Sequence, residues 1–288
     1  MAPTQRHADQ TTGPSRATGL LCLWLLPVLA VFVLAAGAPP AARAEEDNTI
    51  NYAYATWIGT GFYKIKNRSI MVVRAPLSYT LREADSENWG LDLLMPVTLG
   101  LDNFEEESET VGSITFVPGL MLSYPVRDNW WLKPFVQFGV ANDFSDDELA
   151  YVYAGGVKSL ARFEMDGFDL ELGNALLAAE NYHSDRGSDN GFSMVEIGLN
   201  VRFPIDYKVQ NKRTHLNTFV VYSEFVNDLD FFQEEDEEID INRLYKIGVA
   251  LGVEGNFEIM GLAFRGVGVD LTLGNGFTGF GLTTGFPF

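Results

Sequence analysis

Length, composition and charge exclude several classes of protein. The chain has 288 residues, enough for one large domain or two small ones. Its formal net charge of −19 argues against nucleic-acid binding, which requires a basic surface. A single cysteine excludes a disulfide scaffold.

The beginning of the chain has the pattern of an export signal. A weakly basic start leads into the apolar run "GLLCLWLLPVLAVFVLAAGA", and an A-x-A site ending at Ala44 follows. The sequence therefore predicts a signal peptide over 1–44, cleaved after Ala44. An uncleaved membrane anchor is the alternative, which Pro27 inside the apolar run disfavours. Because 1–44 holds three basic residues and one acidic residue, cleavage changes the net charge from −19 to −21 and removes Cys22.

In the remainder of the chain, apolar residues alternate with charged, polar or small residues. This alternation extends over blocks of about 10 to 13 residues, the length of a tilted membrane β-strand. The block "MVEIGLNVRF" is the clearest, and no block is as long as the ~20 apolar residues of a membrane helix. The fold class predicted is all-β, a transmembrane antiparallel up-and-down β-barrel over 54–288 behind a short periplasmic segment, 45–53. The twelve expected strands are 54–65, 70–82, 89–101, 113–124, 130–141, 149–162, 168–180, 192–204, 215–227, 241–254, 262–273 and 277–288.

Connections and aromatic residues predict an orientation for this barrel. The acidic runs at 102–109, 143–148 and 228–240 all follow odd-numbered strands, so they share one end, and long loops of outer-membrane barrels face outward. Aromatic residues near strand ends predict two girdles. The inner girdle comprises Tyr79, Trp89, Tyr124, Trp130, Phe168, Phe203 and Phe286. The outer girdle comprises Tyr63, Tyr151, Tyr182, Phe192, Phe225 and Phe277.

Four prolines fall inside consecutive predicted strands, at Pro76, Pro96, Pro118 and Pro134. Proline cannot donate to a β-ladder, and a closed barrel offers no edge to hold it. Two accommodations are compatible with the sequence: β-bulges, or a local seam of weak pairing.

The alternation predicts which charged side chains face the lumen, five of each sign. They are Arg74, Asp92, Lys133, Lys158, Asp169, Glu171, Glu196, Arg202, Lys246 and Asp270. A network of paired charges filling a narrow lumen is the favoured interpretation, and a selective solute pathway is the alternative. Twelve strands predict a small or partly blocked pore.

Signals for catalysis and for metal or cofactor binding are weak, so the sequence predicts a protein that is not an enzyme and has no cofactor. His183 precedes Ser184 and Asp185 in an expected loop, which provides no triad geometry, and His215 is expected at the surface. A lipid-acting hydrolase using His183 is an alternative function. The acidic run at 234–238 is expected to be solvated, with a bridge to lipopolysaccharide through divalent ions as a minor hypothesis.

Several stretches resemble the solitary outer-membrane autotransporter-type β-barrel family, over about residues 55–288. They are "ATWIGTGFYKI", "RAPLSYTLR", "WGLDLLMPVTLG", "FVPGL", "LKPFVQFGVAND", "YAGGVKSLARF", "FVNDLDFF" and "GFPF". The resemblance implies an autotransporter barrel without a passenger domain, and it supplies no catalytic residue. About ten residues separate Ala44 from the first expected strand, which is too few for a passenger or for a helix through the lumen.

The last expected strand carries a second feature of this resemblance. Its outward positions are Phe280, Leu282, Phe286 and Phe288, and a terminal Phe resembles the signal that the barrel-assembly machinery reads. We therefore expect an integral outer-membrane protein of a Gram-negative bacterium, a narrow porin-like channel or a structural surface protein. Its expected partners are outer-membrane lipids, lipopolysaccharide and the assembly machinery, with neither nucleic acid nor a covalent passenger. A soluble periplasmic β-sandwich is the remaining alternative.

Overall fold

The computed structural model describes residues 52–65, 68–85, 87–102, 111–144, 149–183, 189–229, 241–259 and 262–288. Every described residue belongs to one compact unit, 44–288. The predicted signal peptide and its cleavage after Ala44 lie outside the described residues.

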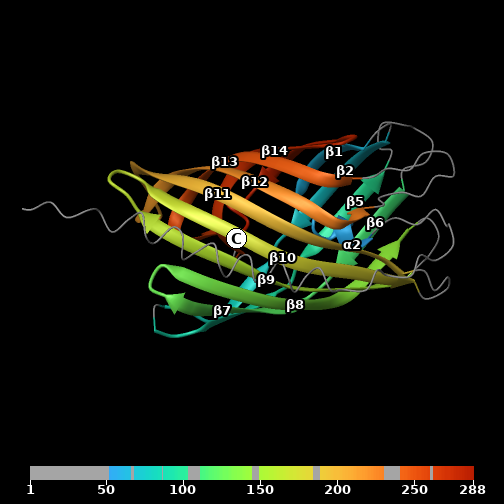
Figure 1. Ribbon diagram of the computed structural model, residues 1–288, viewed down its shortest axis with the longest axis horizontal. Helices are drawn as coiled ribbons and strands as arrows, with labels where there is room; N and C mark the ends of the chain where they lie inside the picture. Colours follow the sequence, from blue (N-terminus) through green and yellow to red (C-terminus); the bar gives the residue numbers. More distant parts are fainter. Residues whose placement is uncertain are drawn as a thin grey trace, which may run out of the picture. The chain divides into compact units, whose positions relative to one another are not determined.

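The described chain consists of a one-turn helix, α2 (Tyr52–Ala55), and fifteen strand segments in antiparallel ladders (Figure 1). The segments are β1 (Thr60–Ile65), β2 (Arg68–Ala75), β3 (Ser78–Arg82), β4 (Gly90–Leu94), β5 (Val97–Asp102), β6 (Val111–Phe116), β7 (Gly119–Arg127), β8 (Trp130–Asp143), β9 (Leu149–Glu164), β10 (Asp169–His183), β11 (Asp189–Val209), β12 (Lys212–Leu229), β13 (Ile241–Ile259), β14 (Leu262–Gly274) and β15 (Phe277–Thr283).

These segments form twelve wall strands, because β2 with β3, β4 with β5, and β6 with β7 each make one strand interrupted by a proline. β2 pairs with β5 while β3 pairs with β4, and β8 pairs with both β6 and β7. The β8–β9 ladder and the β1–β15 ladder complete the ring. The predicted all-β antiparallel barrel of twelve strands is confirmed.

The prolines produce a seam of weak pairing and not bulges. Ala75 pairs with Val97 and Ser78 with Leu94, so both strands advance by three residues across the interruption and none is inserted. The same holds one strand further, where Val97 pairs with Phe116 and Leu94 with Gly119. Register is therefore kept across the seam.

Single hydrogen bonds hold the seam together. The amide N–H of Met95 donates to the Leu77 carbonyl (2.8 Å), that of Val117 to Pro96 (3.4 Å) and that of Phe138 to Pro118 (2.9 Å). In the fourth strand the proline causes no interruption, and β8 runs continuously through Pro134.

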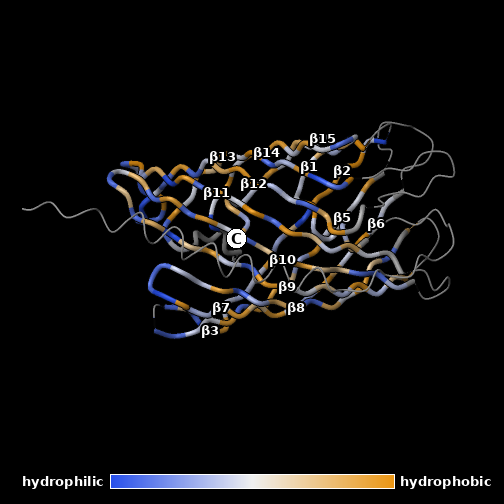
Figure 2. The backbone as a smooth tube through the Cα atoms, viewed as in Figure 1, coloured by the Kyte–Doolittle hydropathy of each residue, from blue (hydrophilic) through white to orange (hydrophobic). Residues whose placement is uncertain are grey.

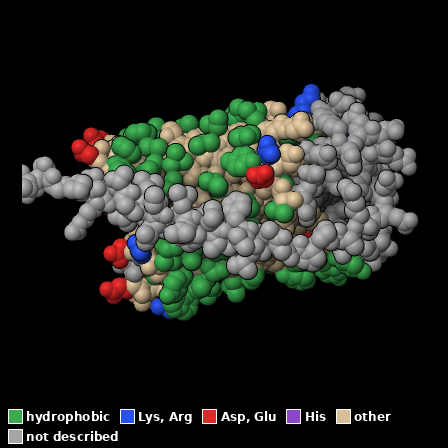
Figure 3. All heavy atoms as spheres, viewed as in Figure 1, with side chains coloured by type: hydrophobic (Ala, Val, Ile, Leu, Met, Phe, Trp, Pro, Cys, Tyr) green, Lys and Arg blue, Asp and Glu red, His purple; other side chains and the backbone are tan. Residues whose placement is uncertain are grey.

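The outer face of the wall is apolar. Residues alternate between buried and exposed along the strands, as in β15, and the exposed set is rich in Val, Ile, Leu and Phe. Figures 2 and 3 show the apolar positions along the strands and the hydrophobic side chains over the outer wall, with charged side chains mostly toward the ends. No helix among the described residues has the length and apolarity to cross a membrane.

The two ends of the barrel differ in their connections. We call the end at which β1, β5, β8, β10, β12 and β14 finish the loop end, and the opposite end the turn end. At the turn end Gln210 and Asn211 both have positive φ (49° and 65°), as a two-residue hairpin turn requires. In the turn before β4, the Asn88 side chain and the backbone N–H groups of Glu87 and Asn88 donate to Asp85 and lower the pKa of its carboxyl group.

The first and last strands are shorter than predicted. β1 begins at Thr60 and not at residue 54, and β15 ends at Thr283 and not at residue 288. The flanking residues 52–58 and 284–288 fold into the barrel. Ala53, which was expected at the end of a periplasmic segment, is therefore buried in the lumen. The four-residue helix α2 lies inside the lumen without running through it, and the sequence did not predict this helix.

Candidate functional site: the barrel lumen

An aromatic plug fills the lumen at the loop end. Tyr54 of α2 is buried and lies edge-on to Phe192 of β11 (ring centroids 5.6 Å apart) and Phe225 of β12 (5.7 Å). Phe192 and Phe225 also contact each other edge-on at 5.8 Å. Such edge-to-face packing adds about 1 kcal/mol per pair to the burial of the rings. We call residues 52–58 the plug segment.

Further contacts fix the plug segment to the wall. Trp57 stacks on Phe135 of β8 at 5.8 Å, and the backbone N–H of Ala53 donates to Asn181 of β10 (3.4 Å). The Trp57 carbonyl accepts from Arg74 of β2 (3.5 Å). The segment is therefore attached to strands on several sides of the barrel.

The inner wall around the plug segment is apolar, which the sequence did not predict. The buried cluster there includes Ile65, Val152, Leu177, Met194, Val221, Ile241, Leu244 and Phe277. Four residues assigned to the outer aromatic girdle, Tyr63, Phe192, Phe225 and Phe277, belong to this cluster. That assignment is wrong because a helix inside the lumen gives inward aromatic residues an apolar partner. Tyr151 and Tyr182 are exposed on the wall.

A second segment, which we call the tail (residues 284–288), occupies the middle of the lumen. In Figure 1 the C-terminus lies midway along the length of the barrel. Phe288 is 5% exposed, and a Cβ atom at Gly173 or Gly198 would overlap its ring. Phe286 packs on Phe219 of β12, with ring centroids 6.0 Å apart. The glycines of β10 and β11 thus leave the space that the tail fills.

The prediction that four outward residues of the last strand share the lipid face is half wrong. Phe280 and Leu282 are 54% and 58% exposed on the outer wall. Phe286 and Phe288 instead lie in the lumen, since the chain leaves the wall after Thr283. The reason is local, because Gly285 adopts a φ of 125° that turns the backbone inward.

Lys158 of β9 contacts both inserted segments. Its ammonium group donates to the Pro287 carbonyl (2.8 Å) and lies 5.1 Å from the ring centroid of Trp57. The carbonyl and the aromatic ring thus both stabilise the ammonium group, and neither of these two contacts involves a carboxylate. Lys158 therefore couples the tail to the plug segment.

All ten charged residues predicted to face the lumen lie on inner-face positions, and they form separate groups. Arg74 and Lys158 contact the inserted segments, as described above. Asp92 accepts from Thr80 (2.7 Å), Glu196 from Ser223 (2.9 Å) and Asp270 from Thr272 (3.5 Å). Lys133 is buried and Lys246 is half-buried between outward neighbours. Asp169, Glu171 and Arg202 lie toward the turn end.

Glu171 organises a network near the turn end. Its carboxylate forms ion pairs with Arg162 (2.6 Å) and Arg202 (3.3 Å), and it accepts from the amide of Asn200 (2.8 Å). The same Asn200 amide donates to Asn217 (3.1 Å). These contacts join β9, β10, β11 and β12 across the inner face.

Replacing Glu171 with Gln should destabilise the barrel, because two arginines lose their shared carboxylate in a buried position. We expect a loss of about 2 kcal/mol in the free energy of unfolding. Urea unfolding in detergent micelles measures this quantity. The matched control is Glu164→Gln at an exposed position, which should change it by less than about 0.5 kcal/mol. An equal effect of both variants would contradict the structural role of Glu171.

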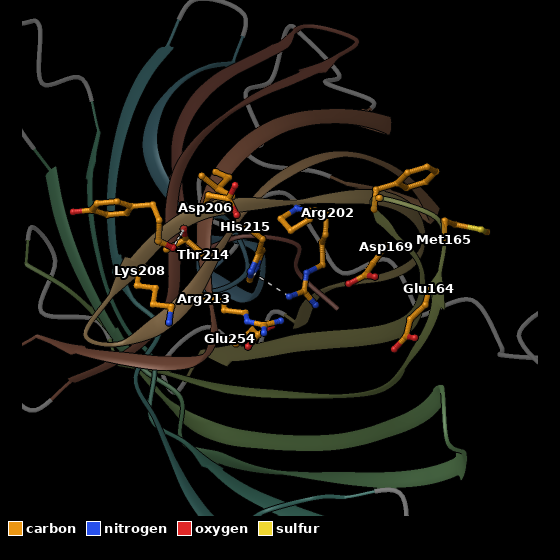
Figure 4. A pocket seen from close by; sticks show the side chains of 15 residues that line it. Glu164, Met165, Asp169, Arg202, Asp206, Lys208, Arg213, Thr214, His215 and Glu254 are labelled. Atoms are coloured by element: carbon orange, nitrogen blue, oxygen red, sulfur yellow. Dashed lines mark hydrogen bonds between the residues drawn. The ribbon is translucent and has the colours of Figure 1, made fainter.

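A cavity of about 870 Å³ opens at the turn end. Figure 4 shows side chains of both signs around it, with His215 directed toward Arg202. His215 Nδ1 lies 3.2 Å from the Arg202 guanidinium, so this histidine is half-buried on the inner wall and not at the surface as expected. The charged lining residues are Glu164, Asp169, Arg202, Asp206, Lys208, Arg213 and Glu254.

Thr214, the hydroxyl residue next to His215, donates to the Tyr207 carbonyl (2.6 Å) and not to the imidazole. Ser184, Asp185 and the acidic run at 234–238 lie outside the described residues. Within the described ranges no three His, Cys, Asp or Glu side chains gather as a metal ion would require.

Comparison with known proteins identifies the fold. No protein-family model matches the chain, and no curated protein matches it. Among solved structures, the chain is similar to the β domain of the Bordetella autotransporter BrkA, with a TM-score of 0.51 and 12% identity. The match covers 79% of this chain and 96% of that domain. LpxR from Salmonella typhimurium matches with a TM-score of 0.42 and 11% identity, over 76% of this chain and 88% of that one. The match to the BrkA β domain shows that this chain shares its β-barrel fold.

Proposed function

We propose that this protein is an integral outer-membrane β-barrel without enzymatic activity, whose lumen is closed at rest by its own plug segment and tail. The observation that carries the proposal is the insertion of Tyr54 between Phe192 and Phe225 at the loop end. An open pore has no apolar core across its lumen. The protein thus acts as a structural surface protein or as a narrow channel that must first displace these segments.

The outer wall supports the membrane location. Exposed apolar side chains cover it, and a soluble protein rarely exposes an apolar surface of this extent. Tyrosines at the loop end pair with carboxylates on the same face: Tyr153 with Glu180 (2.6 Å) and Tyr222 with Glu224 (2.9 Å). Aromatic residues with polar partners are typical of the level where a membrane meets water.

Membrane fractionation tests the location. The protein should remain in the outer-membrane fraction after gentle lysis, and its mature form should begin after Ala44 by mass. Release into the soluble fraction would instead support the periplasmic β-sandwich. The proposed partners are the lipids around the wall, lipopolysaccharide with divalent ions at the acidic loops, and the assembly machinery. The resemblance to solitary autotransporter-type barrels supports a protein without a passenger.

The alternative of a lipid hydrolase is tested separately. Purified protein is incubated with phospholipid and with lipid A, as wild type and as His183→Ala. We expect background cleavage from both. Activity that His183→Ala abolishes would overturn the non-enzymatic proposal.

Deleting Phe288 should lower the amount of protein inserted in the outer membrane. Since the folded protein holds Phe288 in the lumen, the assembly machinery would have to read this residue before the tail folds inward. Quantifying folded protein in outer-membrane fractions by its heat-dependent gel shift measures the effect. The substitution Thr284→Ala, which keeps the terminal aromatic, should insert normally. Unchanged insertion of the deletion variant would refute the assembly role.

A further inference from the structure

Beside the first and last strands, the described barrel wall is incompletely paired. Among the described residues, Ser78–Arg82 (β3) pair with β4 alone. On β14, the ladder to β15 covers Gly268–Gly274, whereas 262–267 form a ladder with β13 alone within the described ranges. The two strand edges, one on β3 and one on β14, therefore lie on either side of β1 and β15 in the turn-end half of the wall. In a bilayer, unpaired backbone groups of such edges are costly.

The gap arises because β1 and β15 are too short. They have six and seven residues, while a tilted membrane strand needs about 9 to 11. The gap begins next to Thr60, on its side toward the turn end. The Thr60 hydroxyl donates to the Arg74 carbonyl and accepts from the Arg74 N–H, both at 2.9 Å. From Thr60 toward the turn end, neither β1 nor β15 continues in the described wall, and their continuations would close it.

The plug segment and the tail have the length and pattern to supply those ends. Continuing the observed β1–β15 register, in which Thr60 pairs with Leu282, places Thr56 opposite Phe286 and Tyr54 opposite Phe288. Continuing the β14–β15 register, in which Gly268 pairs with Thr283, brings the tail beside residues 263–267. Both strands would then have twelve residues, with Phe286 and Phe288 on the apolar face of Phe280 and Leu282.

A hinge for this rearrangement lies at Gly285. Its φ of 125° is unfavourable for any side chain, yet no atom lies within 4 Å of the position a Cβ would take. The Thr283 hydroxyl holds the turn by donating to the Gly285 carbonyl (2.9 Å) and accepting from its N–H (3.2 Å). A substitution here opposes the inward turn without touching the lumen contacts.

We propose that residues 54–59 and 284–288 exchange between the lumen and the wall. In the lumen state, which the structure shows, they close the pore and leave the two edges without a partner strand in the described part of the chain. In the wall state they extend β1 and β15 past the gap and vacate the lumen. The edges on β3 and β14 are thus docking sites for the chain's own segments. The inference rests on the proposed membrane location, and it deepens the proposed function by naming what opens the pore.

Disulfide trapping in outer membranes tests the exchange, with Cys22 replaced by Ser in every variant. Thr56→Cys with Phe286→Cys reports the wall state. Gly173→Cys with Phe288→Cys reports the lumen state, where a Cβ at Gly173 would lie 2.9 Å from that of Phe288 and a small shift of the tail brings the pair to disulfide distance. Lys64→Cys with Thr278→Cys is the positive control, because these residues pair in β1–β15. Thr56→Cys with Gly285→Cys is the negative control, since adjacent strand positions point to opposite faces.

Both reporter pairs should cross-link, the wall pair more slowly than the positive control. Adding Gly285→Val should raise the wall-pair yield roughly tenfold, because a β-branched residue disfavours the inward turn. Thr284→Val should leave the yield unchanged. The exchange is overturned if the wall pair stays reduced, with and without Gly285→Val, while the positive control cross-links. Failure of the positive control would instead contradict the proposed membrane barrel.

Discussion

Replacing Tyr54 with Ala should cost about 3 kcal/mol in the free energy of unfolding. Tyr54 is the buried ring that joins β11 and β12 through Phe192 and Phe225, and its loss leaves a cavity that the wall strands cannot collapse to fill. Equilibrium unfolding in urea, performed in detergent micelles, measures the change. The effect should be among the largest of any single substitution in the described lumen.

A tyrosine on the outer wall is the matched control for this substitution. Tyr79 is 62% exposed, so Tyr79→Ala should change the free energy of unfolding by less than about 1 kcal/mol in detergent. If Tyr54→Ala is no more destabilising than Tyr79→Ala, the plug segment does not pack as described.

Replacing Gly198 with Leu should expel the tail from the lumen. A Cβ at this position would lie 2.6 Å from Phe288 and 2.8 Å from Phe286, so both rings must move. Phe288→Cys, which leaves the Phe286 ring to overlap the new side chain, measures the result by its reaction with a membrane-impermeant maleimide. We expect the reaction rate to rise about tenfold in the Gly198→Leu background. This rise corresponds to a loss of ~1.4 kcal/mol in the free energy that favours the buried tail.

Gly155→Leu is the control, because a Cβ there meets no atom closer than 3.5 Å. This variant should leave Phe288→Cys protected. Equal labelling of Phe288→Cys in the wild-type and Gly198→Leu backgrounds would contradict the placement of the tail between β10 and β11.

Much of the wall could be predicted from the sequence because alternation reports which side of a strand each residue faces. The block around Ile197 and Leu199 has exposed apolar residues on one face and buried Glu196, Gly198 and Asn200 on the other, as the pattern indicates. Proline disrupted this inference only locally. Pro76, Pro96 and Pro118 interrupt their strands without changing register, so alternation continues across them.

The contents of the lumen could not be predicted in the same way. Alternation places Phe192 and Phe225 on one face but does not say whether lipid or a protein segment covers it. The residues 54–59 and 284–288 also alternate like strands, so the pattern alone fits the wall as well as the lumen. Two local signals point inward: the glycines at 173 and 198, which leave space opposite each other, and Gly285 at the point of the turn.

The electrostatic groups of the lumen were only partly predictable. The signs and faces of Glu171 and Arg202 follow from their strands. Their convergence with Arg162 depends on the stagger between β9, β10 and β11, which places Glu171 opposite Arg162 on one side and Asn200 on the other. Register of this kind is set by turns and packing along whole strands, so single residues do not reveal it.

Conductance of the purified wild-type protein in planar bilayers tests the central claim that the lumen is closed at rest. A dye on Lys64→Cys, an exposed position of β1, reports insertion of each molecule independently of current. The account predicts bilayers that contain labelled protein and carry no steady current at low voltage. A stable current step for every inserted molecule would show an open lumen and contradict the account.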